Sequence, residues 1–291
     1  MMDSKPTKYY LPAPSAWPIK ASLSVFTLLA GIANWLHSAW YGPYLTLMGA
    51  MLLIYVVVGW FSEVIHENRC GLLKGRQVDH SFRFGMCGFI FSEVMFFGAF
   101  FGALFYIRIF ALPMMGDAGS ATHYTIWPHF QYTWPLIQNP SPGQYIGPQE
   151  AMNAWGIAAI NTLILLTSGV TVTIAHFCLL KNKRKTMLLA QSVTVMLGVT
   201  FLIMQANEYM DAYTNMGLTL SSGIYGSTFF ILTGFHGLHV TIGTIGLSVI
   251  LYRMWRHDFN EYNHFGFEAV SWYWHFVDVV WLLLFVFVYW L

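Results

Sequence analysis

Seven apolar runs of membrane-spanning length constrain this chain more than any other feature of its sequence. A bilayer core of about 30 Å needs about 20 mainly apolar residues per helix. Only 9% of the 291 residues are charged, against about a quarter in a soluble domain. The sequence therefore predicts an all-α membrane protein with seven transmembrane helices. The runs lie at about 18–40, 44–66, 82–108, 152–180, 187–212, 223–254 and 266–290.

The basic residues predict one orientation for these helices. All of the 14 Lys and Arg residues except Arg108 fall on one side, if the runs alternate in direction. The positive-inside rule then places the N-terminus in the cytoplasm (or matrix) and the C-terminus outside. A net charge of +1 gives no reason to expect a nucleic-acid partner. The basic residues on the inner side include Lys5, Lys8, Lys20, Lys74, Lys181 and Arg253.

The connections predict how the helices are grouped. Gly42-Pro43 leaves only a short link between the first two runs, so we expect a two-helix hairpin within residues 1–66. A charged connector covers about 67–81, and a five-helix bundle follows over 82–291. The longest connection, about 111–151, contains two Trp-Pro pairs, which suit a folded cap on the outer membrane interface.

Signatures of soluble enzymes and of metal sites are missing from the sequence. Cys70, Cys87 and Cys178 show no Cys-x-x-Cys spacing, so neither a disulfide framework nor a zinc site is indicated. There is no Walker loop, dinucleotide fingerprint, Ser-His-Asp order or EF-hand loop. We therefore predict no catalytic residue, no metal site and no cofactor within this chain.

Glu93 is the most informative carboxyl in the apolar runs. It lies ten residues beyond Arg83, or about 15 Å of helix, which places it near the bilayer centre. An isolated carboxyl at that depth should be neutral, because burial disfavours the charged form. It either exchanges protons or binds a partner, or it is a neutral acid hydrogen-bonded to a neighbouring helix.

His236 and His239 lie three residues apart, and therefore on one face of a helix. A histidine pair could ligate haem or copper, but such a site needs more imidazoles than this chain offers at the same depth. We favour the alternative, a hydrogen-bonded contact between helices.

The last apolar run carries a polar stripe. Glu268, Ser271, His275 and Asp278 fall within about 80° of one another at 100° per residue. Trp274 and Trp281 point the other way. The stripe is either a buried polar network or part of a proton path, if water reaches it. We favour the network as a packing device.

Several histidines are expected on the cytoplasmic side beside acidic residues. Together they could collect protons near neutral pH, although solvated loop residues would give the same pattern. The histidines are His66, His80, His257 and His264, and the neighbouring acids are Glu63, Glu67, Asp79, Asp258 and Glu261.

The residue strings resemble subunit III of haem-copper cytochrome c oxidase over nearly the whole chain. The longest and most specific strings are Thr233-Gly-Phe-His-Gly-Leu-His-Val240 and the segment from Phe265 to Trp281. Earlier matches include the segment from Tyr9 to Pro18 and Phe91-Ser-Glu-Val-Met-Phe-Phe97.

The resemblance implies a seven-helix subunit without haem or copper, in which a lipid-filled cleft separates the two-helix and five-helix parts. Such a subunit packs on catalytic subunit I, which works with subunit II. It binds phospholipids and supports proton uptake. The haem and copper lie in the partner subunits. The whole complex oxidises cytochrome c, reduces oxygen to water and pumps protons.

The resemblance also assigns roles to particular residues. Glu93 matches the buried acidic residue of the third helix, and Arg253 matches the basic residue that holds a lipid phosphate, a role suited to its charged fork. Trp60 and Phe61 stand where the family has lipid-contacting aromatic residues. The string from Trp60 to Glu63 departs from the mitochondrial Trp-Trp-Arg-Asp, and Leu72-Leu73-Lys74 replaces Gly-His-His.

These departures favour a bacterial inner membrane over the mitochondrial inner membrane. One alternative within the superfamily is subunit III of a quinol oxidase, although those subunits typically lack the first two helices. An alternative from another class is a seven-helix transporter.

Overall fold

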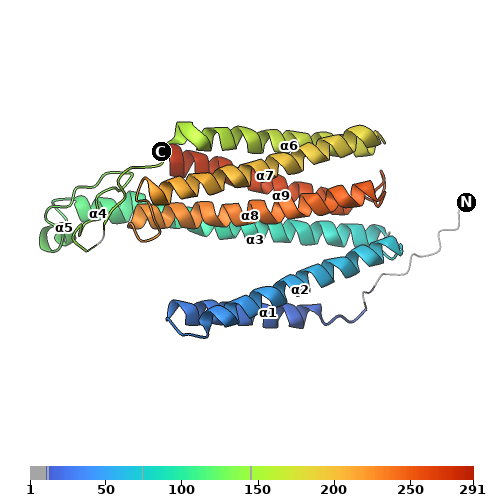
Figure 1. Cartoon of the computed structure of the whole chain (residues 1–291), viewed down its shortest axis with the longest axis horizontal. Helices are drawn as coiled ribbons and strands as arrows, with labels where there is room; N and C mark the ends of the chain where they lie inside the picture. The colour runs from blue at the N-terminus through green and yellow to red at the C-terminus, as the bar shows by residue number, and fades with distance from the viewer. Residues whose placement is uncertain (1–10, 12, 74, 145) are drawn as a thin grey trace, which may run out of the picture. The chain divides into compact units, whose positions relative to one another are not determined.

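The computed structural model describes residues 11, 13–73, 75–144 and 146–291. Lys5, Lys8, Lys74 and the Tyr9-Tyr10 start of one family string lie outside the described residues. The described part is all helical (Figure 1). Its helices are α1 (Trp17–Leu36), α2 (Gly42–Arg69), α3 (Arg76–Tyr106), α4 (Leu112–Gly116), α5 (Ala121–Thr125), α6 (Ala159–Leu180), α7 (Arg184–Thr214), α8 (Ile224–Trp255) and α9 (Phe265–Leu284).

Seven helical segments of the described part are long and apolar enough to cross a membrane. They are α1, α2, the continuous segment Arg76–Gly116, Ala154–Leu180, α7, α8 and Phe265–Trp290. The segment Ala154–Leu180 begins with a π-helical turn at Ala154–Ala158, and the segment Phe265–Trp290 ends with one at Phe285–Trp290. The prediction of an all-α membrane protein with seven spans is confirmed.

Two helix ends differ from the prediction. α3 begins at Arg76 rather than near residue 82, because an Asp79–Arg83 ion pair of 2.9 Å supports its polar first turns. α1 ends at Leu36 rather than near residue 40, because Ser38 has a φ of 59°, a left-handed conformation that terminates helices. Hydropathy marks the apolar part of a helix, not its ends.

The chain divides into two compact units, residues 1–84 and 85–291, with the boundary inside α3. In the first unit, α1 and α2 form a close antiparallel pair joined by a short link (Figure 1). A Cβ atom on Gly31 would lie 2.4 Å from the Thr46 nitrogen, and one on Gly49 would lie 2.4 Å from the Leu28 nitrogen. The hairpin therefore depends on glycines that let the two backbones touch.

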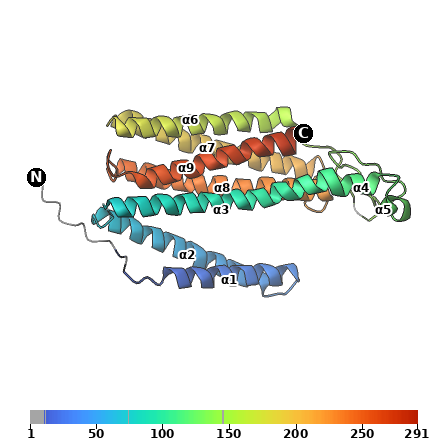
Figure 2. The same ribbon diagram turned by 180° about the vertical axis from the view of Figure 1, so that it is seen from behind.

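In the second unit, α6, α7, α8 and α9 run side by side with the rest of α3 (Figures 1 and 2). Trp274 and Trp281 of α9 are fully buried. Their indole nitrogens donate to Ser168 Oγ (2.8 Å) and Thr162 Oγ1 (2.9 Å) on α6. These bonds fix the rotation of α9. The prediction that the tryptophans point away from the polar stripe is wrong, because Asp278 of the stripe packs against Gly169 of the same helix, α6.

The connection between α3 and α6 is folded onto the second unit. It contains α4 and α5, and Phe130 and Leu136 are buried in the same core as α9. The Arg108 guanidinium stacks 4.7 Å from the centre of the Trp134 ring, and the Tyr132 hydroxyl donates to the Arg108 carbonyl (3.0 Å). The aromatic residues of this segment thus pack as a cap.

Candidate functional site

Glu93 on α3 and His239 on α8 form a hydrogen-bonded pair in the second unit. Glu93 Oε2 lies 2.9 Å from His239 Nε2, and the two side chains are 20% and 11% exposed. The rings of Phe97 and Phe96 lie 5.0 and 5.9 Å from the imidazole. The carboxyl is therefore not isolated, because it is hydrogen-bonded to a neighbouring helix.

The position of one proton in this pair follows from the geometry. His239 Nδ1 lies 2.6 Å from the Phe235 carbonyl. A carbonyl can only accept, so Nδ1 carries a proton. The hydrogen bond between Nε2 and Glu93 then holds one further proton, which belongs either to the carboxyl or to the imidazole. The pair can pass a proton between an acid and a base without breaking the bond.

His236 makes a different contact from His239. Its Nε2 donates to the Val277 carbonyl of α9 (3.2 Å), and its ring lies 5.0 Å from that of Trp281. The residue is 1% exposed. The two histidines share a helix but serve separate helix contacts, so they do not converge on one ligand.

The polar residues of α9 fall into two groups rather than one continuous network. His275 Nδ1 lies 3.4 Å from Asp278 Oδ2, and His275 Nε2 lies 3.2 Å from Thr173 Oγ1 on α6. Asp278 fits because a Cβ on Gly169 would lie 2.5 Å from Oδ2. Ser271 does not link this group to Glu268, because its buried hydroxyl has no hydrogen-bond partner within the described part.

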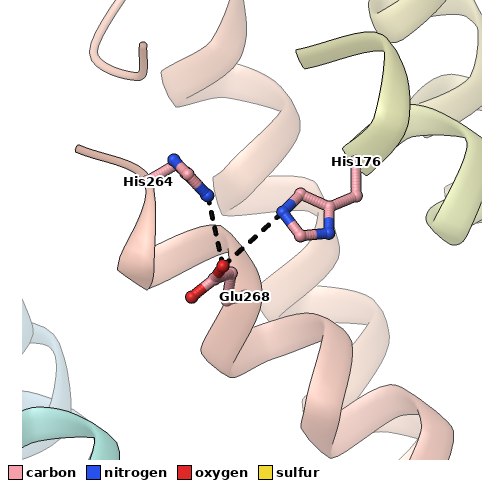
Figure 3. A group of neighbouring side chains, drawn as sticks. All are labelled: His176, His264 and Glu268. Atoms are coloured by element: carbon pink, nitrogen blue, oxygen red, sulfur yellow. Dashed lines mark hydrogen bonds and ion pairs between the residues drawn. The ribbon is translucent and has the colours of Figure 1, made fainter. Parts of the chain in front are cut away.

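The second group gathers around Glu268 (Figure 3). Glu268 Oε1 lies 3.2 Å from His264 Nε2 and 3.7 Å from His176 Nε2. His264 precedes α9, whereas His176 comes from α6. His176 was not expected at this site, although an imidazole near the end of an apolar run is itself a signal for a polar partner.

Arg253 is engaged within the chain. Its Nε donates to Asp258 Oδ2 (3.3 Å), and its guanidinium stacks 4.4 Å from the centre of the Phe259 ring. The residue is 7% exposed. The structure thus places a buried ion pair at the position that the resemblance assigns to a lipid phosphate.

The aromatic residues of α2 lie in the first unit. Trp60 and Phe61 are exposed, and Trp60 lines a groove of about 490 Å³. Trp17 and Glu63, which line the same groove, are hydrogen-bonded to each other through the indole nitrogen and a carboxylate oxygen.

The expected cytoplasmic histidines do not share one set of contacts. His257 Nδ1 accepts from Arg184 (2.6 Å), His264 contacts Glu268, and His66 contacts Cys70 (3.6 Å). Each of these imidazoles thus has its own local partner.

An apolar groove in the second unit was not expected from the sequence. It has a volume of about 730 Å³ and lies between α3 and α9. Gly98 and Gly102 line it, and a Cβ on either would meet nothing within 4 Å. Arg108 lines it too, and its guanidinium donates to the carbonyls of Phe287 (3.1 Å) and Leu291 (2.8 Å).

Comparison with known proteins shows the family of this chain. The family model for cytochrome c oxidase subunit III matches residues 7–291. Cytochrome c oxidase subunit 3 of Oryctolagus cuniculus is 38% identical over 285 residues, which cover 97% of this chain and 96% of the relative. The homologue from Prototheca wickerhamii is 40% identical over 281 residues, with the same coverage. The homologue from Lumbricus terrestris is 39% identical over 282 residues, covering 97% of both chains. The chain therefore belongs to the cytochrome c oxidase subunit III family.

Proposed function

We propose that this chain is a non-redox subunit of a proton-pumping cytochrome c oxidase. The observation that carries the proposal is the family match over residues 7–291. Haem and copper belong to the partner subunits, which oxidise cytochrome c and reduce oxygen to water. This chain contributes stability, bound phospholipid and support for proton uptake.

The polar face of α9 supports direct packing on catalytic subunit I. His275 lies ten residues into α9, about 15 Å along the helix, and its side chain is 45% exposed. A half-exposed imidazole is costly against lipid, and intramembrane ionisable residues normally face protein or water. A hydrogen-bonding group on the catalytic subunit would satisfy it.

Two observations support phospholipid binding. The groove between α3 and α9 is almost wholly apolar and is lined by Arg108, so it suits an acyl chain beside an anionic headgroup. Trp60 and Phe61 offer exposed aromatic surface on α2. The contact of Arg253 with a lipid phosphate is proposed from the family resemblance. The lipid-filled cleft between the two-helix and five-helix parts likewise stays a prediction.

The shared hydrogen bond of Glu93 and His239 supports a role in proton uptake. The pair is partly exposed and can hold its proton on either partner. It would exchange protons with a path in the catalytic subunit rather than take part in oxygen chemistry. The membrane proposed is a bacterial inner membrane, from the departures at Trp60–Glu63 and Leu72–Lys74.

The test is a tagged pull-down of the full chain from native membranes in mild detergent. We expect haem to co-purify, with oxygen uptake driven by reduced cytochrome c. The control is the same preparation supplied with a reduced quinol, which should not support uptake. Quinol-driven uptake would favour the quinol oxidase alternative. A haem-free chain from intact membranes would contradict an oxidase role and favour the transporter.

A further inference from the structure

Two imidazoles and one carboxylate converge between the end of α6 and the start of α9 (Figure 3). One ring nitrogen of His176, one of His264 and one Glu268 carboxylate oxygen all lie within 4.8 Å of one another. The two distances to Glu268 Oε1 are 3.2 and 3.7 Å. A tetrahedral zinc ion with bonds of about 2.05 Å needs ligand atoms about 3.3 Å apart. Both imidazole nitrogens lie close to that spacing from Glu268 Oε1.

The backbone contact of His264 turns its Nε2 atom toward Glu268. His264 Nδ1 lies 3.1 Å from the Asn260 carbonyl, which can only accept a hydrogen bond. Nδ1 must therefore carry a proton, and in the neutral ring the lone pair of Nε2 faces Glu268 Oε1. Two acceptor atoms 3.2 Å apart repel each other unless a proton or a metal ion lies between them. A carbonyl on the second ring nitrogen is also the usual support of a metal-bound histidine.

The surrounding backbone holds these side chains in place. The amides of Phe267 and Glu268 donate to the His264 carbonyl (2.9 and 3.2 Å), which fixes the first turn of α9. The His176 ring lies 5.4 Å from that of Phe267. The side chains of His264 and Glu268 are 11% and 13% exposed, whereas that of His176 is 29% exposed. The site is thus preorganised and open on one side.

We propose that His176, His264 and Glu268 bind a divalent transition-metal ion of the zinc class. Two imidazoles and a carboxylate are a common zinc ligand set, with water in the fourth position. Mg²⁺ and Ca²⁺ prefer oxygen ligands alone. The ion would tie α6 to the first turn of α9. This site goes beyond the proposed oxidase role and does not depend on it.

The first test measures zinc in the purified full-length chain with its co-purifying partners. The preparation is stripped with a chelator, titrated with Zn²⁺ alone and analysed for bound metal. We expect His264→Ala and Glu268→Gln to lower the affinity of one site at least about tenfold, since even outer-shell changes cost about 10- to 100-fold. The matched control is His257→Ala, which removes an imidazole that contacts Arg184 instead. Unchanged zinc binding in both ligand variants would overturn the proposal.

A second measurement uses the unmodified protein, in case a variant fails to assemble. Imidazoles are modified with diethyl pyrocarbonate, with and without Zn²⁺, and the products are mapped by mass spectrometry. We expect zinc to slow the modification of His176 several-fold, because the ion would occupy its Nε2 atom, and to leave the modification of His257 unchanged. Equal modification of His176 under both conditions would overturn the site. Haem content, measured in parallel, reports separately on the oxidase role.

Discussion

Glu93 on α3 and His239 on α8 are joined by a hydrogen bond of 2.9 Å between Oε2 and Nε2. Because His239 Nδ1 donates to the Phe235 carbonyl, this bond contains a single proton. The arrangement explains how a carboxyl persists at this depth of an apolar helix. Its acid proton has a base to go to, so neither partner needs to be buried as an unpaired charge.

Glu93→Gln should keep the hydrogen bond and remove the exchangeable acid proton. We expect intact haem spectra and a moderate fall in cytochrome c-driven oxygen uptake. Glu93→Ala, the control, loses the bond as well and should be less stable than Glu93→Gln by about 0.6–2 kcal/mol, the range for interhelical hydrogen bonds in membranes. Oxygen-uptake rates and thermal unfolding check both. Complete loss of oxygen reduction in Glu93→Gln would place chemistry on this chain.

The exposed imidazole of His275 should matter for subunit association. His275→Leu alone would also remove the contact of the buried Asp278, so the informative variant is the double change His275→Leu with Asp278→Leu. Replacing both partners by apolar groups can be nearly neutral for folding. We expect a chain that folds but is lost from the catalytic subunit several times faster during detergent washing.

The control for that experiment is Leu282→Val, an apolar change at an exposed position of the same helix that does not line the groove between α3 and α9. It should be retained like the unmodified chain. Equal retention of the double variant would mean that α9 does not present its polar face to a partner.

Replacing Arg253 should lower both the stability of the fold and the amount of bound phospholipid. Arg253→Ala removes the guanidinium that pairs with Asp258, and breaking a buried ion pair costs about 3–5 kcal/mol. We expect lower phosphorus content per haem and a shorter working life of the complex. Asp258→Asn should also destabilise the end of α8, because it breaks the same ion pair. The variant complex should keep its bound phospholipid, because the Arg253 guanidinium remains. Normal phospholipid content and normal lifetime in Arg253→Ala would refute the lipid assignment.

The α1–α2 hairpin should be intolerant of side chains at its glycine contacts. A Cβ on Gly49 would lie 2.4 Å from the Leu28 nitrogen, so Gly49→Ala must push the helices apart. We expect a loss of about 1–3 kcal/mol, the usual cost of overpacking. Gly88→Ala is the control, since its Cβ meets nothing within 4 Å and it does not line the groove between α3 and α9. Thermal unfolding in detergent measures both, and equal melting temperatures would mean that the hairpin does not need close backbones.

The sequence by itself determined the number and approximate positions of the spans. A bilayer leaves a chain few ways to satisfy its backbone, and helices of about 20 apolar residues are the main one. Helix geometry also predicted that polar residues recur along one side of α9. These results follow from spacing within one helix.

Only the tertiary structure decided which polar groups meet. The pairing of Glu93 with His239, the split of the α9 stripe and the approach of His176 to Glu268 join residues far apart in the sequence. Such contacts depend on the rotation and packing of separate helices, and these are set by local features such as the fit of Asp278 against Gly169 and of Trp274 against Ser168. The spacing of residues along one helix carries no information about which face of another helix lies opposite.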